Sequence, residues 1–591
     1  MSAIITHRFR KNNVQNVFDE MVSPKVMIAG CASSGTTVTP SAGYVPANLQ
    51  VGMAVTTSSG TGTLSTSMTT IVTSISTTTF QIYPQPTVTL SGALLSFYSQ
   101  YYIGIGKSDP YNGSLEGSDQ APLPPIASRK YDVDVRNNLI ALQKVSVALN
   151  SGSVSSIGAI VGNAGYVLPR YNWTSGNYYK AWDSSDPSCF YPSAITAGTQ
   201  YPCFVVYSNK VYICVSSGYD DSPSHYASTD NPSTYATVMG TVGATDSKSY
   251  RWVYVSDLAL DTSDTITARA LTASSNTSST LDSSQFFKIY RRATTTGTSV
   301  ATSPTASAGG IYSVHVAAGG TGYTIGSTFI IDGDGTTTAS GSITAVSGTA
   351  ITNVAITTTG SGYTTGTVRF TSGSGTGAVL YPRIAPPSGF GYDVVDDLPS
   401  FYAGFYANFA YDAVYPGSAD VPALDQIRQL SLIRNPVVFN SSTGSTITYR
   451  CLKSITIDTN TGNLPGVGDI FEITNGASSG SRGFVNYVTV SGGNYLVYYH
   501  QNSSTFGAAG NSLSPKPVVT GGAYKYYTKS SNYAAATVGS NTITAVSTTP
   551  LLSTGSEEYV AGTGEVIFIQ NRVPITQASG QTEAITIVTQ F

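Results

Sequence analysis

The chain has 591 residues, of which only 10% are charged, and its formal net charge is −3. This length exceeds what one hydrophobic core can organise, and the near balance of 29 basic and 32 acidic residues excludes a field that would attract nucleic acid or anionic lipid. Abundant glycine (59) and tyrosine (40), with frequent Ser and Thr, indicate a β-rich structural chain with a surface of hydroxyls and amides.

The first residues of the chain are predicted to form a short amphipathic helix. Residues 8–21 carry apolar side chains at helical spacing, namely Val14, Val17, Phe18 and Met21. No apolar stretch follows the basic N-terminal residues, so no secretory signal is predicted, and no apolar run reaches the ~18 residues of a membrane span. Residues 22–100 then form a Thr/Ser/Gly-rich block with short Val/Ile strands, which predicts an inserted β-domain.

The stretch IGIGKSDP (Ile103–Pro110) has the spaced glycines and the Gly-Lys-Ser of a phosphate-binding loop. Such a loop needs a glycine five positions earlier, where this chain has Tyr101. In such a loop a helix should begin next, but here Asp109 and Pro110 follow. The chain does not match a dinucleotide-binding fingerprint either, because Asp109 occupies the position of its third glycine. A glycine-kinked strand that runs into a turn is predicted instead, with no nucleotide or other cofactor.

Three further elements are predicted before residue 260. Residues 136–149 carry apolar side chains every three or four positions, which predicts a helix, although their valines lower helix propensity. Residues 203–215 read as two strands joined by a tight Ser-Asn-Lys turn. Residues 249–258 read as one alternating strand. One face of that strand is aromatic, with Tyr250, Trp252 and Tyr254.

An internal repeat marks a second inserted block. The sequence IYSVHVAAGGTGYT begins at Ile311, and the similar ITNVAITTTGSGYT begins at Ile351, 40 residues later. Each copy is an alternating strand closed by Gly-x-Gly-Tyr, in which glycine permits a positive φ and tyrosine can cap a core. Two copies are too few for a solenoid, so residues 293–388 are predicted to form a small β-domain with a duplicated hairpin. Residues 445–555 are predicted to form a third inserted β-domain.

The remaining segments are predicted to form one core that carries these inserts. Its N-terminal part consists of residues 1–21 and 101–292, and its C-terminal part of residues 389–444 and 556–591. The predicted fold class is mainly β: a sandwich-like core with a few short helices, in a multidomain chain with small inserted β-domains.

No metal site is predicted. The five cysteines include no Cys-x-x-Cys pair and are predicted to be buried, reduced thiols, with a Cys203–Cys214 disulfide as the alternative. The four histidines are scattered without metal-ligand spacing. The sequence DGDG (Asp332–Gly335) lacks the remaining ligands of a calcium loop and predicts a turn.

No catalytic site is predicted either. Adjacent acids on a strand point to opposite faces and do not make an acid/nucleophile couple, and neither a nucleophile elbow nor a Cys/His couple is present. The tyrosines are expected to fill cores and protein interfaces, with sugar contact by an inserted domain as the alternative. Three carboxylate pairs are predicted to be exposed turn residues: Asp220/Asp221, Asp396/Asp397 and Glu557/Glu558.

Four segments form a colinear set of motifs. They are LPRYNW (168–173), YRWVYV (250–255), IRQLSLIRNPV (427–437) and GEVIFIQNRVPITQASGQTEAITIVTQF (564–591). In this order they resemble elements of the baseplate wedge protein of T-even-type contractile-tailed phages, the gene-product-eight family. The three inserted blocks have no counterpart in that family.

The resemblance also covers YYIGIGKSDPYN (101–112), where Lys107 and Asp109 stand in the places of the family's arginine and glutamate. The matching residues are expected to be structural or interface residues. They are Gly104, Gly106, Lys107, Asp109, Pro110, Pro169, Arg170, Trp173, Trp252, Arg428, Gln429, Asn435, Pro436, Asn571, Arg572, Pro574, Gln581, Thr582 and Glu583.

The resemblance implies a non-enzymatic, largely β protein that dimerises within each baseplate wedge and contacts the other wedge subunits until the tail contracts. The chain is therefore expected in the tail baseplate of the virion after assembly in the host cytoplasm, without nucleic acid or membrane as partners. One alternative is a host-surface binding tail or fibre protein whose inserts are adhesive modules. The other alternative is a tail-associated glycan hydrolase, and the scattered carboxylates are its only support.

Overall fold

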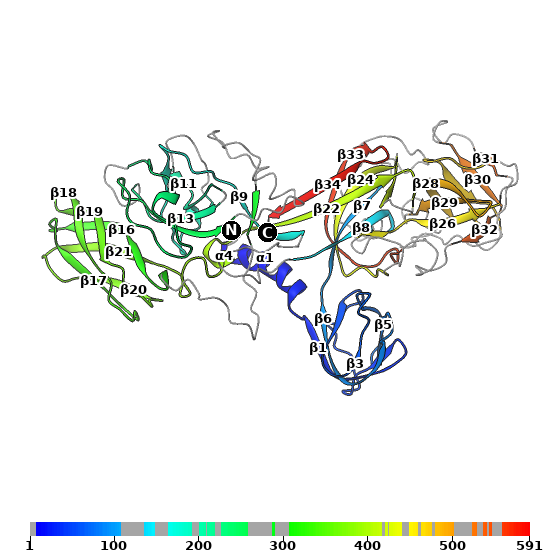
Figure 1. The fold of residues 1–591 in the computed structure, drawn as a ribbon, viewed down its shortest axis with the longest axis horizontal. Coiled ribbons are helices and arrows are strands. Elements are labelled where there is room, and N and C mark those ends of the chain that lie inside the picture. Colours follow the sequence, from blue (N-terminus) through cyan, green and yellow to red (C-terminus); the bar gives the residue numbers. More distant parts are fainter. Residues whose placement is uncertain are drawn as a thin grey trace, which may run out of the picture. The chain divides into compact units, whose positions relative to one another are not determined.

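The fold is seen in a computed structural model of the chain, which is mainly β (Figure 1) and confirms the predicted fold class. The chain divides into two compact units: unit 1 contains Met1–Asn16, Val147–Phe405 and Thr586–Phe591, and unit 2 contains Val17–Ser146 and Tyr406–Ile585. The structure describes residues 7–107, 135–147, 163–191, 200–208, 210–218, 226–257, 286–289, 307–415, 420–423, 425–439, 448–458, 463–475, 479–501, 523–528, 536–539, 543–546 and 558–590.

The N-terminal helix is confirmed, whereas the second predicted helix is wrong. Helix α1 spans His7–Val22 and buries Val14 and Phe18. Residues 136–149 contain strand β8 (Leu139–Val145), in which Ile140 and Ala141 are as fully buried as the residues counted toward a helical face. A strand in the interior of a sheet is apolar on both faces, and this produces a continuous apolar run that resembles a buried helix.

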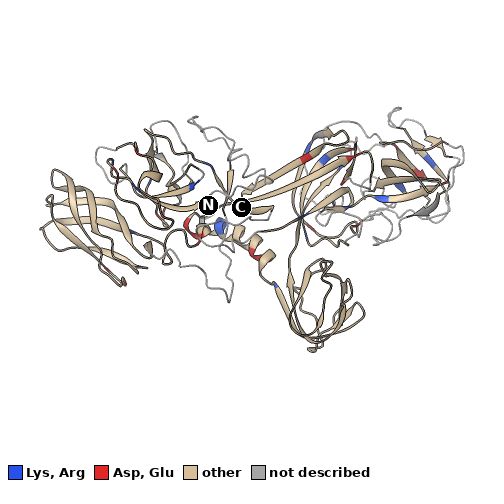
Figure 2. Ribbon diagram, viewed as in Figure 1, with Lys and Arg blue, Asp and Glu red and all other residues tan. Residues whose placement is uncertain are grey.

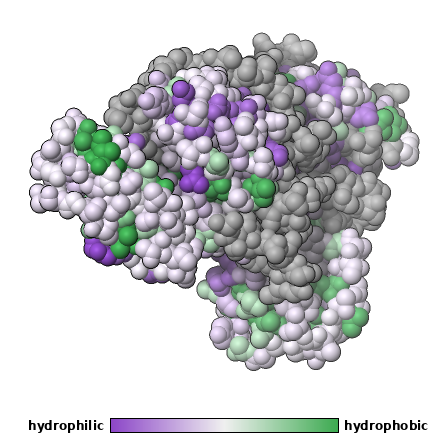
Figure 3. All heavy atoms as spheres, turned by 60° about the vertical axis from the view of Figure 1, so that its left-hand side comes forward, coloured by the Kyte–Doolittle hydropathy of each residue, from purple (hydrophilic) through white to green (hydrophobic). Residues whose placement is uncertain are grey.

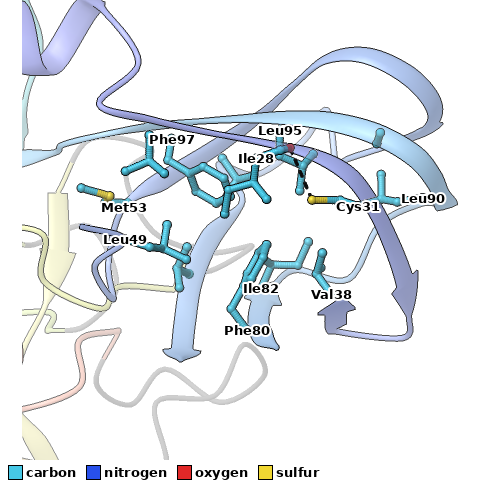
Figure 4. Close-up of a cluster of buried hydrophobic side chains, with 14 of the residues drawn as sticks. Ile28, Cys31, Val38, Leu49, Met53, Phe80, Ile82, Leu90, Leu95 and Phe97 are labelled. Atoms are coloured by element: carbon cyan, nitrogen blue, oxygen red, sulfur yellow. Dashed lines mark hydrogen bonds between the residues drawn. The ribbon is translucent and has the colours of Figure 1, made fainter. Parts of the chain in front are cut away.

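Residues 26–98, in unit 2, form a closed six-stranded barrel. Its core is apolar and includes Phe80, Ile82, Leu95 and Phe97 (Figure 4). The strand order around the barrel is β1-β2-β5-β4-β3-β6. No Asp, Glu, Lys, Arg or His occurs in this range, and the barrel strands are tan in Figure 2. The strands are β1 (Val26–Ser34), β2 (Thr37–Thr39), β3 (Ala54–Thr63), β4 (Ile71–Ile75), β5 (Phe80–Tyr83) and β6 (Val88–Tyr98).

A five-stranded sheet in unit 2, called the central sheet below, joins segments that are far apart in the sequence. Its order is β25-β8-β7-β24-β33, and all of its pairings are antiparallel. The strand β24 is buried along nearly its whole length, as expected for the interior of a sheet. Besides β8, its strands are β25 (Thr448–Arg450), β7 (Tyr101–Gly106), β24 (Gln426–Arg434) and β33 (Glu565–Thr576).

A seven-stranded sheet follows in unit 2 and has its own apolar core around Phe471, Val485 and Tyr499. It begins after β25, which the sequence placed in the third inserted block but which pairs with β8 in the central sheet. In sheet order its strands are β31 (Ala536–Val538), β30 (Tyr524–Tyr527), β27 (Ile470–Ile473), β28 (Arg482–Ser491), β29 (Asn494–His500), β26 (Lys453–Ile457) and β32 (Ile543–Val546).

Unit 1 contains several short sheets around an aromatic core. The predicted strand pair at 203–215 is confirmed as β12 and β13, and Ser208 in their turn has a φ of 49°. The predicted strand at 249–258 is confirmed as β14, which pairs with β13. The strands are β9 (Ala164–Pro169), β10 (Tyr178–Tyr179), β11 (Gln200–Tyr201), β12 (Phe204–Tyr207), β13 (Lys210–Ser216), β14 (Arg251–Asp257) and β15 (Phe286–Ile289).

The remaining elements flank these sheets. Strand β22 (Tyr402–Asp412) pairs with β9 through its first residues and with β23 (Val421–Pro422) through its last, and β34 (Thr582–Gln590) also pairs with β22. The short helix α4 (Val394–Asp397) begins after Asp393, whose side chain accepts the N–H of Val395. Two single-turn 3-10 helices are η1 (Pro187–Cys189) and η2 (Pro232–Thr234).

The repeat in unit 1 is a three-strand unit, larger than the predicted hairpin, and the two copies exchange strands. The first strand of each copy pairs with the third strand of the other: β16 with β21, and β19 with β18. The two middle strands, β17 and β20, pair with each other. The strands are β16 (Ile311–Thr321), β17 (Thr328–Gly333), β18 (Ser340–Ser347), β19 (Ala350–Thr358), β20 (Gly366–Phe370) and β21 (Thr376–Ile384).

The Gly-x-Gly-Tyr motifs close this domain from both repeats. Tyr323 and Tyr363 are buried in its single core, as predicted. A methyl group on Gly335 would lie 2.4 Å from the ring of Tyr363, and one on Gly375 would lie 2.4 Å from the ring of Tyr323. Each tyrosine therefore packs against a glycine of the other repeat. The motif glycines all have positive φ: Gly320, Gly322, Gly360 and Gly362.

Candidate functional site

The glycines of β7 permit close packing in the central sheet. A methyl group on Gly104 would lie 2.6 Å from Oγ of Ser431 and 2.7 Å from Cδ2 of Leu139, and one on Gly106 would lie 2.8 Å from the carbonyl oxygen of Asn138. Real Cβ atoms do not approach other atoms so closely, so a larger residue at Gly106 would meet backbone, and one at Gly104 would displace the side chains of Ser431 and Leu139. The stretch that resembled a phosphate loop is thus a central strand, of which Asp109 and Pro110 lie outside the described residues.

Lys107 belongs to a polar network that joins the central sheet to β28 and β29. Its Nζ lies 3.9 Å from Oδ1 of Asp425. Asn486 donates to Oδ2 of Asp425 at 2.6 Å, and its own Oδ1 lies 2.7 Å from Nδ1 of His500. Since Asn486 uses its NH₂ group on Asp425, the Nδ1 of His500 is the donor to Asn486. These four residues are called the Lys107 network below.

Burial sets the charge states within the Lys107 network. Burial raises the pKa of Asp425, and the positive charge of Lys107 opposes that rise. Burial, followed by the charge of Lys107, lowers the pKa of His500 well below its usual value. His500 is therefore neutral in the folded protein and stacks on Phe484 with ring centroids 5.1 Å apart.

Four of the family-motif residues form two direct pairs at β33. Gln429 on β24 donates from Nε2 to Oδ1 of Asn571 at 2.8 Å. Arg572 lies with its Nη1 2.6 Å from Oε1 of Glu583, and the hydroxyl of Tyr411 donates to the other oxygen of Glu583 at 3.4 Å. Burial and the charge of Glu583 raise the pKa of Tyr411, so this hydroxyl remains a donor at neutral pH.

Asn435 connects the central sheet to the loop that precedes β3. Its φ is 52°, a conformation that asparagine tolerates better than most residues. Its Oδ1 accepts the N–H of Gln100 at 2.8 Å, and its Nδ2 donates to Oε1 of Gln50 at 2.9 Å. Pro436 follows it, and a methyl group on Gly564 would lie 3.1 Å from the Cα of Pro436.

The other motif residues of unit 2 have local partners. Arg428 is buried and donates from Nη2 to Oε1 of Gln426 at 3.0 Å. The carbonyl oxygen of Gln581 accepts the N–H of Tyr411 at 2.9 Å, and Thr582 is the exposed first residue of β34. Pro574 lies within β33, and its side chain is outside the described residues.

Three motif residues of unit 1 lie at the end of β9 or just after it, and the backbone N–H of Trp173 donates to the carbonyl oxygen of Val206 on β12 at 3.0 Å. Pro169 ends β9 opposite Phe286. Arg170 is buried, donates from Nε to Oδ1 of Asn172 at 2.7 Å, and has its pKa lowered by that burial. The indole N–H of Trp173 donates to Oγ of Ser228 at 3.1 Å.

Trp252 lies in the aromatic core that Trp173 borders. Its ring is 5.4 Å from that of Tyr179 in an edge arrangement and stacks on Tyr250 at 6.0 Å. Trp173 packs edge-on against Tyr207 at 5.5 Å. Large aromatic side chains make rigid packing surfaces, so this cluster organises the module around β12, β13 and β14.

Two acids that the sequence placed in exposed turns are buried, and the prediction is wrong for both. Glu558 forms an ion pair with Arg450, at 2.8 Å between Oε1 and Nη2, and both side chains are 6% exposed. Asp397 is 1% exposed and accepts the N–H of Gly391, and burial raises its pKa well above the usual value. Asp396 is exposed and pairs with Lys11. The other three acids, Asp220, Asp221 and Glu557, lie outside the described residues.

The DGDG turn is held by contacts with the second repeat of the same domain. Asp332 pairs with Arg369. Asp334 accepts the backbone N–H groups of Thr364 and Thr365 at 2.9 Å and 3.0 Å, and the hydrogen bond from the Thr364 hydroxyl is the main cause that lowers its pKa to about 2. Both carboxylates thus already have partners, which lie on β20 or just before it.

No cluster of three or more His, Cys, Asp or Glu side chains suited to a metal occurs among the described residues. All five cysteines are free and buried, as predicted, and the alternative Cys203–Cys214 disulfide is absent. Within the part of the chain that the structure describes, no helix is both long and apolar enough to cross a bilayer.

No protein-family model matches this chain, and no curated protein matches it either. The functional interpretation therefore depends on the motif residues themselves. The structure groups the motif residues that it describes in two places: the central sheet with β34, and the aromatic module of unit 1.

Proposed function

We propose that this chain is a structural subunit of the baseplate wedge of a contractile-tailed phage. It holds neighbouring wedge proteins through broad non-covalent contacts and performs no catalysis. The subunit dimerises and is assembled in the host cytoplasm before it becomes part of the virion.

The observation that carries the proposal is the meeting of distant motif segments in one sheet. The segments 101–107, 427–436 and 564–576 are far apart in the sequence, yet they supply the adjacent strands β7, β24 and β33. The pairs Gln429–Asn571 and Arg572–Glu583 are formed entirely by motif residues. Segments that match one scaffold in order are expected to lie together, and these segments do.

The composition also supports a role in assembly. Few charges and many tyrosines suit large interfaces, because charged side chains are depleted and aromatic ones enriched at interface cores. A subunit of this kind acts through contact area, which for stable assemblies reaches about 2,000 Å² or more per interface.

The test is assembly with the wedge proteins of the same phage. Purified chain is expected to sediment as a dimer in analytical ultracentrifugation and to form a larger complex when mixed with these proteins. The matched control is a wedge subunit from an unrelated phage, which should not join the complex. A lone monomer that fails to associate with any wedge protein would refute the proposal.

A second candidate function is binding to the host surface by the inserted domains. It is favoured by large apolar side chains that these domains expose, including Tyr44 (62%) on the barrel and Ile325 (64%) and Tyr381 (57%) on the repeat domain. On the face seen in Figure 3, hydrophobic residues form separate green areas on a mostly pale surface. Isolated exposed residues are common, so this candidate stands second. Phage that carry a deletion of the barrel should then assemble but adsorb poorly to the host.

A further inference from the structure

Three cysteines of unit 1 are joined through their backbones at the aromatic module. The N–H of Cys203 donates to the carbonyl oxygen of Cys189 at 2.7 Å, and the N–H of Cys214 donates to the carbonyl oxygen of Cys203 at 2.7 Å. Each of the three residues is at most 1% exposed. Cys203 is therefore the middle member of a buried group of cysteines.

The hydrogen bond between Cys203 and Cys189 limits the separation of their backbones. The amide nitrogen lies about 1.46 Å from its own Cα, and a carbonyl oxygen lies about 2.4 Å from its own Cα. Together with the 2.7 Å hydrogen bond, these lengths keep the two Cα atoms within about 6.6 Å of each other. The Cα atoms of disulfide-bonded cysteines are about 4.4–6.8 Å apart, so these two backbones are already within reach of a disulfide.

The side chains of the two cysteines also meet. Burial, followed by a side-chain hydrogen bond with Cys189, raises the pKa of Cys203 well above its usual value. A disulfide brings two sulfur atoms to about 2.05 Å and removes two hydrogen atoms, so it occupies less room than two thiols in contact. The buried position of the pair is therefore compatible with the bond.

Cys214 is a less suitable partner for Cys203. It stands opposite Cys203 where the pairing of β12 with β13 continues beyond Phe204 and Ile213. Directly opposed residues of antiparallel strands have Cβ atoms about 4.5–5.5 Å apart, whereas the Cβ atoms of a disulfide are about 3.8 Å apart. The thiol of Cys214 is also engaged on its own strand, since it donates to the carbonyl oxygen of Ser216 at 3.1 Å.

We propose that Cys189 and Cys203 form a disulfide bond when the protein meets a small-molecule disulfide such as oxidised glutathione. Cys189 ends η1 and follows a loop in which Ser184 and Ser185 are exposed, so opening of this loop uncovers Cys189 first. Its thiolate attacks one sulfur of the oxidant and releases one glutathione. The sulfur of Cys203 then attacks the sulfur of Cys189 and releases the second. Each cysteine loses a proton, and two electrons pass to the oxidant, which ends as two thiols.

The biological setting of this bond rests on the proposed function. A wedge subunit is made in a reducing cytoplasm and later meets the oxidising surroundings of the free virion, where disulfides persist. The bond ties η1 to the residue that precedes β12 and closes the loop between the two cysteines. Closing a loop restricts the unfolded chain, so oxidation stabilises the aromatic module of unit 1 after assembly.

Peptide mass spectrometry tests the pairing. Reduced full-length protein is incubated with oxidised glutathione, alkylated and digested without reduction. We expect one linked peptide pair that contains Cys189 and Cys203, and the loss of two of the five free thiols. Hydrogen exchange of residues 186–191 should slow at least about tenfold in the oxidised protein, because the closed loop holds η1 in place.

Cys189→Ser should abolish both the linked peptide and the change in exchange. The serine hydroxyl can still donate to the carbonyl oxygen of Asp183, as the thiol does at 3.4 Å, so this variant keeps a native contact. Cys31→Ser is the matched control and should change neither result, because Cys31 is equally buried in the barrel and residues 26–98 contain no second cysteine.

Three outcomes would overturn the proposal. They are five free thiols after prolonged incubation, a linked peptide of Cys203 with Cys214, and a glutathione adduct that persists on Cys189. None of these outcomes bears on assembly with wedge proteins, which is measured on the reduced protein.

Discussion

The barrel and the central sheet belong to the same unit but are stabilised differently. Residues 26–98 contain no Asp, Glu, Lys, Arg or His, so the buried residues of the barrel carry no charge, and most of them are apolar. The central sheet and its borders instead contain the buried pair Arg450–Glu558 and the Lys107 network. An apolar core tolerates wide changes of pH and salt, whereas buried charges make a structure specific and sensitive to the loss of one partner. The following predictions test this difference, from the largest expected effect to the smallest.

Arg450→Ala is expected to have the largest effect. It leaves Glu558 buried and unpaired, and breaking such a pair costs about 3–5 kcal/mol. Hydrogen exchange measured by mass spectrometry should show faster opening of β25 and β8, while peptides of the barrel keep their protection. The double variant Arg450→Met with Glu558→Leu removes both charges and should recover most of the protection. Equal loss of protection in the barrel would contradict the independence of the two regions.

Gly104→Ala is expected to destabilise the central sheet by about 1–3 kcal/mol, which is the usual cost of overpacking. The added methyl group would overlap Ser431 and Leu139. The matched control is Gly466→Ala, whose methyl group would meet only Oδ2 of Asp469, at 3.6 Å. Denaturant melts followed by exchange of β7 peptides should separate the two variants, and equal stability of the two would contradict the packing argument.

His500 is expected to make the Lys107 network sensitive to acid. Its folded pKa is lowered, mainly by burial and then by Lys107, while the unfolded histidine takes up a proton below about pH 6.5. The stability that depends on neutral His500 is therefore complete above about pH 6.5 and is lost as the pH falls toward the lowered folded value.

The measurement for His500 is hydrogen exchange of β28 and β29, corrected for intrinsic rates, between pH 7.5 and 5.5. His500→Gln keeps a donor for Asn486 but does not titrate, so the acid-dependent loss of protection should disappear in this variant. An unchanged pH dependence would assign the effect to other groups, such as Asp425.

The barrel is expected to show the smallest effect of all. Its thiol does not titrate in the working range, because burial raises the pKa of Cys31 to about 11. Between pH 5 and 8, and between low and high salt, the opening free energy of barrel peptides should change by less than about 0.5 kcal/mol, the usual size of effects away from charges and packing. A larger change would show that the barrel depends on contacts with charged residues elsewhere.

The sequence predicted the local features of this chain well. The spacing of Val14, Phe18 and their neighbours predicted α1, and the Gly-x-Gly-Tyr motifs predicted turns and capping tyrosines. These features depend on residues close together in the sequence. The prediction at 136–149 was wrong because a strand buried on both faces has no alternation to distinguish it from a helix.

The arrangement of the candidate site could not be predicted from the sequence. Gln429 and Asn571 are far apart in the chain, and nothing near either residue indicates the other. Glu558 was predicted to be exposed because its partner, Arg450, lies on another strand of the fold.

The exchange of strands in the repeat domain has a consequence for how that domain forms. The first strand of each copy pairs with the third strand of the other copy, so a single copy leaves its first strand without that partner, and the one core of the domain needs both copies. The short turn between Ser347 and Ala350 holds the copies at a high effective concentration. Closure is consequently a unimolecular reaction whose yield does not depend on how much protein the cell makes.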